Sequence, residues 1–131
     1  MYSYEFLDHK ADIKIQIKAS TIEEIFNAIV DVFNKITCED SEGEEIRFIE
    51  LNFKTIEDLV FDFVSELIYF LDAELFVAYA IRCDIQKNRA SFVLFGKRIK
   101  KIKRYVKAIT YHDLKCEKKD NIFICEFILD I

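Results

Sequence analysis

Apolar and polar residues alternate along parts of this chain with the period of a β-strand, and elsewhere they recur with the period of a helix. In residues 12–18 isoleucine alternates with polar residues, as expected of a strand with one wet face. The period then changes, and apolar residues recur at helical spacing up to Ile36. Because Thr21 followed by Glu24 forms a capping-box pattern, the sequence predicts an amphipathic helix over residues 21–36.

The same change of period occurs a second time. Residues 49–54 alternate as another strand, and Thr55 is placed to cap a longer amphipathic helix that ends near Asp72. Short polar connections at 86–89 and 118–121 then indicate hairpins between further strands. These later strands are predicted at 75–85, 90–95, roughly 104–117 and 122–129.

Two helices among about six strands predict an α+β fold class. We expect a single two-layer domain over residues 1–131, with two amphipathic helices packed on a mixed, largely antiparallel sheet. The composition agrees, because 52% of the residues are apolar and the chain has no proline and only two glycines. The sequence contains no glycine-rich phosphate-binding loop, which disfavours a doubly wound nucleotide-binding fold.

Charge is unevenly distributed along the chain. The net charge of -5 disfavours a domain that coats nucleic acid, yet residues 97–107 contain seven lysines and arginines, and an acidic loop is predicted around Gly43. Two interpretations stay open, namely two solvated loops of opposite sign or a basic contact patch for RNA or an acidic protein surface. Since the sequence has neither a membrane-spanning apolar stretch nor the layout of a secretory signal at its start, we expect a cytoplasmic protein that makes no membrane contact.

The four cysteines are far apart and form no Cys-x-x-Cys pair, which disfavours a zinc knuckle or a redox motif. We expect Cys38, Cys83, Cys116 and Cys125 to be reduced and buried as small apolar side chains. A disulfide between Cys116 and Cys125, which flank a short turn, is the alternative.

The only two histidines, His9 and His112, each stand beside an aspartate. Histidines can perform acid–base catalysis or bind a transition metal, but next to strands they are more often structural hydrogen-bonding groups. None of the serines stands in a context that predicts an activated nucleophile. The sequence therefore favours no catalytic residue.

Carboxylates gather at the two ends of the chain. Asp8 and Asp12 lie in a predicted loop that enters the first strand, and Asp130 ends the last strand beside the terminal carboxylate of Ile131. A chain end of this kind can supply two anionic oxygens at nearly one point, as hard cations such as Ca²⁺ or Mg²⁺ prefer. The alternative is a set of separate acids that face solvent.

Three segments of the sequence resemble the archease family. Residues 4–12, Tyr-Glu-Phe-Leu-Asp-His-Lys-Ala-Asp, resemble its Asp-His-Thr-Ala-Asp opening. Residues 106–112, Val-Lys-Ala-Ile-Thr-Tyr-His, resemble its Ile-Lys-Ala-Val-Thr-Tyr-His segment, and residues 127–131 resemble its closing apolar strand with Asp-Ile. Three ordered motifs in one short chain are far more specific than any one of them.

The resemblance implies a non-enzymatic protein that activates the RtcB-type tRNA-splicing ligase by promoting guanylylation of the ligase and its multiple turnover. GTP would be bound by the ligase and not by this chain, and RNA would be contacted indirectly through the ligase. A divalent metal ion, calcium in the family, is also implied, with Asp12, Asp130 and the Ile131 carboxylate as its ligands. The residues expected to contact the ligase or to support the site are Asp8, His9, Lys107 and His112.

Two residues depart from the family pattern. Lys10 stands where the family has threonine, which adds a cation beside the expected metal site, and Lys97 follows Gly96 where the family has an acidic residue. Both departures bear on metal occupancy and on contact with the partner. The alternative function is a small chaperone or RNA-binding adaptor that uses residues 97–107.

Overall fold

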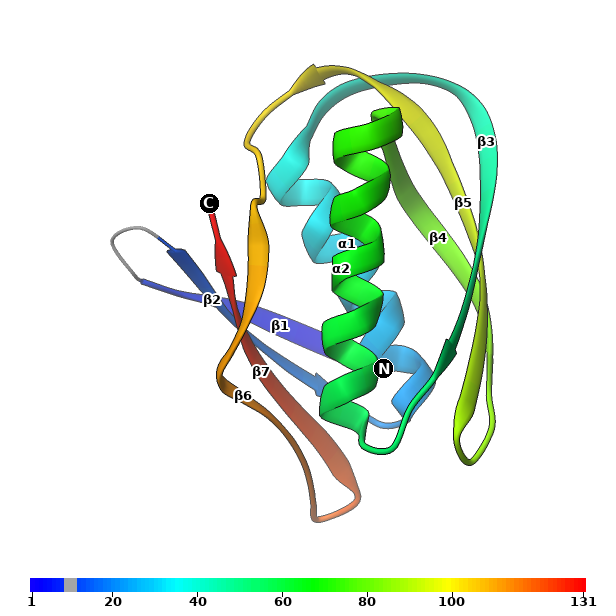
Figure 1. Cartoon of the computed structure of the whole chain (residues 1–131). Helices are drawn as coiled ribbons and strands as arrows, with labels where there is room; N and C mark the ends of the chain where they lie inside the picture. Colours follow the sequence, from blue (N-terminus) through cyan, green and yellow to red (C-terminus); the bar gives the residue numbers. More distant parts are fainter. Residues whose placement is uncertain (9–11) are drawn as a thin grey trace.

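The computed structural model describes the whole chain except residues 9–11 (Figure 1). Two helices and seven strands follow one another in the order β1, β2, α1, β3, α2, β4, β5, β6, β7. Their bounds are β1 Tyr2–Asp8, β2 Asp12–Ala19, α1 Ile22–Thr37, β3 Cys38–Asn52, α2 Ile56–Glu74, β4 Phe76–Ile85, β5 Arg89–Ile102, β6 Ala108–Lys119 and β7 Ile122–Asp130.

The strands form two antiparallel sheets, one with the order β1-β2-β7-β6 and the other with the order β3-β5-β4. The predicted α+β class with two helices is confirmed, but the described residues form seven strands in two sheets where about six strands in one sheet were expected. The additional strand is β1. Its alternation of apolar and polar residues from Tyr2 is short, and one of its apolar side chains, Phe6, is half-exposed. Figure 1 shows both helices between the two sheets.

Both helices begin at the threonines that the capping patterns indicate. The Glu24 N–H donates to Thr21 Oγ1 at 3.2 Å, and the Asp58 N–H donates to Thr55 Oγ1 at 3.1 Å. Each bond satisfies one backbone donor that a helix start would leave open, so a local feature of the sequence determines where each helix begins. Neither helix in the described part of the chain is long and apolar enough to cross a membrane.

Three phenylalanines from three elements meet in the core. Phe26 of α1 packs edge-on against Phe63 of α2 with 5.1 Å between ring centroids, and Phe92 of β5 lies 5.2 Å from the first and 4.6 Å from the second. All three side chains are buried. Aromatic pairs at these separations add to the burial of apolar area, so this cluster fastens the helices to the three-stranded sheet.

The acidic and basic segments pair with each other as neighbouring strands. Glu42 of β3 stands opposite Arg98 of β5, and Lys101 Nζ lies 3.0 Å from Glu39 Oε2. The interpretation of two solvated loops is therefore wrong for residues 39–45 and 97–102, which lie in paired strands where opposite charges support the pairing. Residues 103–107 of the basic segment lie between β5 and β6. Gly43, with a φ of 77°, lies where the register shifts between Glu42 and Glu45.

Cys116 and Cys125 form a disulfide between β6 and β7. The expectation that all four cysteines are reduced is therefore wrong. The physical reason is the strand register, because these two residues stand directly opposite each other with 4.1 Å between their Cα atoms. Cys38 and Cys83 are free and half-buried, and burial raises the pKa of the Cys83 thiol to about 11.

Gly96 offers a direct test of packing in the three-stranded sheet. A Cβ atom at this position would lie closer than 3.0 Å to the backbone oxygen of Val77 and to the ring of Phe76. We therefore expect Gly96→Ala to lower the free energy of unfolding by about 2–3 kcal/mol, measured by urea denaturation.

Gly43→Ala is the matched control, because a Cβ atom there meets nothing within 4 Å and only the positive φ opposes it. Its expected cost is about 1 kcal/mol. Equal losses in the two variants would contradict the close approach at Gly96.

Candidate functional site where the chain ends meet

The pairing of β2 with β7 brings the beginning and the end of the chain together. Asp12, the first residue of β2, stands directly opposite Asp130, the last residue of β7. Directly opposite residues in antiparallel strands project to the same face of the sheet with their Cβ atoms roughly 5 Å apart. The two acids that the sequence singled out are therefore cross-strand neighbours.

The alternation along these strands determines which way the two acids face. Ile15 of β2 and Phe127 of β7 stand opposite each other and are buried in the core. The intervening positions belong to the other face, where Lys14 Nζ and Lys115 Nζ each lie 3.5 Å from a carboxylate oxygen of Glu126. Because side chains alternate between the two faces of a strand, Asp12 and Asp130 belong to this outer face, and they lie at its end.

The structure corrects the expected loop around the first acids. Asp8 is the last residue of β1 and Asp12 the first of β2, so they bound a hairpin rather than lying in a loop that enters the first strand. In the register Asp8 stands opposite Ile13. His9 and Lys10 lie outside the described residues.

Lys107 is brought to the acid pair through its backbone. Its N–H donates to the carbonyl oxygen of Asp130 at 2.8 Å, directly before Ala108 pairs with Asp130 in β6. The Lys107 side chain is exposed, whereas Val106 beside it is buried with 1% of its surface accessible. The buried valine and the backbone bond together fix this part of the chain next to the end of β7.

His112 is not brought to the acid pair. It lies in the irregular part of β6, between Thr110 opposite Ile128 and Lys115 opposite Glu126, two to four residues along β7 from Asp130. By strand spacing that separation is roughly 7–13 Å. Its side chain is 78% exposed, and its Nε2 atom lies 3.3 Å from Asp113 Oδ2. The structure therefore separates His112 from Asp12 and Asp130.

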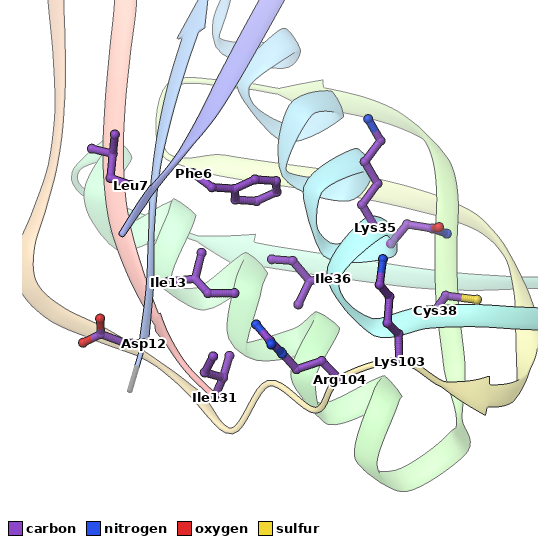
Figure 2. Close-up of a pocket in the computed structure, with 11 residues that line it drawn as sticks. Phe6, Leu7, Asp12, Ile13, Lys35, Ile36, Cys38, Lys103, Arg104 and Ile131 are labelled. Atoms are coloured by element: carbon purple, nitrogen blue, oxygen red, sulfur yellow. The ribbon is translucent and has the colours of Figure 1, made fainter. Parts of the chain in front are cut away.

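A cavity of about 870 Å³ opens beside Asp12 and Ile131, and sequence analysis did not predict it. Figure 2 shows apolar side chains from both strands of the first hairpin and from the end of α1 on its walls, with two cations rising from the segment between β5 and β6. These cations, Lys103 and Arg104, belong to the basic run of residues 97–107, but nothing in the sequence of that run distinguishes them from its other lysines and arginines. The lining residues are Phe6, Leu7, Asp12, Ile13, Asn34, Lys35, Ile36, Cys38, Lys103, Arg104 and Ile131.

The donor atoms at the chain ends suit a hard cation. Within the described ranges 1–8 and 12–131, no group of three histidine, cysteine, aspartate or glutamate side chains is arranged to hold a metal ion. The two opposite aspartates and the terminal carboxylate of Ile131 are all hard oxygen donors, the type that Ca²⁺ and Mg²⁺ prefer. Together these oxygens fit a divalent ion, with water completing its coordination.

Comparison with known proteins gives a match over nearly the whole chain. The family model described as "Archease protein family (MTH1598/TM1083)" matches residues 4–131. A protein archease of Sulfurisphaera tokodaii is 31% identical over 139 residues, covering 100% of both chains. One of Saccharolobus islandicus is 36% identical over 141 residues, again covering 100% of both.

Two solved structures have the same fold. Methanobacterium thermoautotrophicum protein 1598 superposes with a TM-score of 0.79 at 22% identity, covering 98% of each chain. A Thermotoga maritima protein described as an archease and possible chaperone gives a TM-score of 0.72 at 23% identity, covering 95% of this chain and 94% of its own.

The cross-strand acid pair should cost stability when no cation is bound. Like charges directly opposite on antiparallel strands repel, so Asp130→Asn is expected to raise the free energy of unfolding by about 0.5–1 kcal/mol in buffer with a chelator. Urea denaturation measures this change.

Glu126→Gln is the control, since Glu126 lies on the same face of β7 but pairs with Lys14 and Lys115. Its loss should lower stability slightly, by about 0.5 kcal/mol. A destabilised Asp130→Asn variant would mean that the two aspartates do not repel each other.

Proposed function

This chain belongs to the archease family, and from that premise we propose that it activates the RtcB-type tRNA-splicing ligase without being an enzyme itself. It promotes guanylylation of the ligase and its multiple turnover in the joining of tRNA exons. The ligase binds the GTP and carries the covalent guanylate, and this chain contacts RNA only through the ligase. The observation that carries the proposal is the full-length family match together with the meeting of its first and third motifs at Asp12 and Asp130.

The chemistry of the acid pair supports a role at a partner's active site. Asp12 and Asp130 stand at one end of a sheet, next to a chain end that brings a further carboxylate. A divalent cation, calcium by resemblance to the family, would neutralise this charge and offer open coordination positions to a partner's phosphate or carboxylate oxygens. Asp12, Asp130 and Ile131 would hold it, and the aspartates would remain on a rigid pair of strands.

Neighbouring residues have supporting roles in this proposal. The Lys107 N–H bond to Asp130 fixes the end of β7, and the exposed Lys107 ammonium is available to an anionic group of the ligase. Asp8 and His9 belong to the motif that precedes β2 and remain candidates for ligase contact. His112, exposed on the bulged part of β6, would contact the ligase at a separate point rather than assist the acid pair.

A small chaperone or RNA-binding adaptor is the second candidate. It is favoured by the description of the Thermotoga maritima relative as a possible chaperone and by the exposed cations of residues 97–107. RNA binding that occurs without the ligase and is lost when these cations are neutralised would support it. Ion pairs of this segment with β3 make the candidate weaker, because they leave fewer cations for RNA.

The proposal predicts the outcome of a multiple-turnover ligation assay. With catalytic ligase, excess RNA ends and GTP, adding this protein should increase the number of joined products per ligase molecule from about one to many. The protein alone should neither join RNA nor hydrolyse GTP. Unchanged turnover with a cognate ligase would refute the proposal.

Variants of the acid pair distinguish function from folding in the same assay. Asp130→Ala should abolish activation while circular dichroism shows a melting temperature within a few degrees of the native one, because this residue is exposed and contributes little to the core. Glu126→Ala, on the same face of β7, is expected to retain activation. If Asp130→Ala were unfolded at the assay temperature, the residue would have a structural role instead.

A further inference from the structure

The basic run divides into an ion-paired part and a part that faces the cavity. Lys97 and Lys101 of β5 lie 4.0 Å and 3.0 Å from carboxylate oxygens of Glu44 and Glu39. Lys103 and Arg104 follow the end of β5 and line the cavity. Neither of them forms an ion pair with any residue that the structure describes. Two cations of an acidic protein thus remain uncompensated at the wall of a large cavity.

The segment that carries these cations is fastened at both ends. The Lys103 N–H donates to the carbonyl oxygen of Thr37, the last residue of α1, at 2.8 Å, and the Lys107 N–H donates to that of Asp130 at 2.8 Å. Between these bonds Val106 is buried. A backbone held in this way keeps the cations in position before any ligand arrives, which lowers the entropy lost on binding.

The remaining walls combine apolar surface with a third cation at the rim. Phe6 is 49% exposed, and Ile13 and Ile36 lie below it in Figure 2. Lys35 donates to the hydroxyl of Tyr4, and this bond raises the pKa of Lys35, so its ammonium remains charged. Figure 2 shows Arg104 extending toward Ile13 and Ile36, Lys103 pointing toward the end of α1, and the Lys35 ammonium extending away from both.

We infer that this cavity binds a nucleoside phosphate, with the phosphate between Lys103 and Arg104 and the base against Phe6. A terminal phosphate carries roughly two negative charges and matches two cations, whereas one carboxylate would leave a cation unneutralised. Arginine binds phosphate through two parallel hydrogen bonds, and an exposed aromatic ring provides a stacking surface for any base. A volume of about 870 Å³ accommodates such a group.

The groups that would hold the ligand are the cations and not the acids nearby. Asp12 and Ile131 border the cavity as well, but Figure 2 shows the Asp12 carboxylate directed away from it, so Lys103 and Arg104 are the groups placed to bind a phosphate. The ligand can be a free nucleotide or the phosphorylated end of an RNA strand. The phosphate site itself is argued from the residues of this chain. Only the choice of RNA as the source of the phosphate rests on the proposed function.

Binding is tested on the isolated protein with three probes. They are a fluorescent six-nucleotide RNA with a terminal phosphate, the same RNA without that phosphate, and adenosine monophosphate as a competitor. Fluorescence anisotropy should show that removing the terminal phosphate weakens binding about tenfold or more. If adenosine monophosphate displaces the RNA at a concentration similar to the one at which RNA half-saturates the protein, a free nucleotide is the ligand. If it competes only weakly, the ligand is an RNA end.

Two variants with the same change of charge locate the site. Lys103→Ala/Arg104→Ala should weaken binding of the phosphorylated RNA about tenfold or more. It should also reduce the slope of log K against log salt concentration by about one for each cation removed. Arg98→Ala/Lys100→Ala removes the same residue types from the exposed surface of β5 outside the cavity and should leave binding within about twofold. Phe6→Ala should weaken RNA binding but not the competition by inorganic phosphate.

Two results would overturn this inference. Equal weakening by both double variants would mean diffuse attraction of RNA to the basic run. Loss of ligase activation in Lys103→Ala/Arg104→Ala, with no RNA or nucleotide binding by the native protein, would assign the cavity to an acidic segment of the ligase. In the second case the proposed function would stand, so its failure and the failure of the phosphate site are distinguishable.

Discussion

The antiparallel pairing of β2 with β7 is the interaction on which the rest of the site depends. It sets Ile15 against Phe127 in the core and, by the same register, sets Asp12 against Asp130 on the outer face. A shift of one residue would turn apolar side chains outward and separate the acids, so the burial of the core enforces the geometry of the site. The backbone bond from the Lys107 N–H to Asp130 then attaches the segment whose Lys103 and Arg104 line the cavity.

The elements that sequence analysis predicted well are those determined by local features. Thr21 and Thr55 mark both helix starts because a capping hydrogen bond joins residues only three apart. The strands β3 and β5 extend further than predicted because their charged parts are stabilised by each other, across a long separation in sequence. The disulfide of Cys116 with Cys125 likewise depends on the strand register. A turn between two strands indicates that they pair, but it does not determine which residues stand opposite each other.

The candidate site was predicted in part for the same reason. Asp12 and Asp130 could be singled out as carboxylates near the chain ends, and the register brings them together. His112 was grouped with them because it belongs to a family motif, but the bulge in β6 separates it from their end of the sheet. The cavity was missed because its cations, Lys103 and Arg104, acquire their distinct surroundings only when β5 ends and the chain bonds to α1.

We propose that the chain end itself completes a site for a hard cation with Asp12 and Asp130. Adding two neutral residues after Ile131 moves the terminal carboxylate away while every side chain remains in place. Calorimetric titration of Ca²⁺ into the native and extended proteins tests the claim directly. We predict clearly weaker binding by the extended chain, because calcium affinity depends on the number of charged ligands. Equal affinities would contradict the claim and would leave only the two aspartates as ligands from this group.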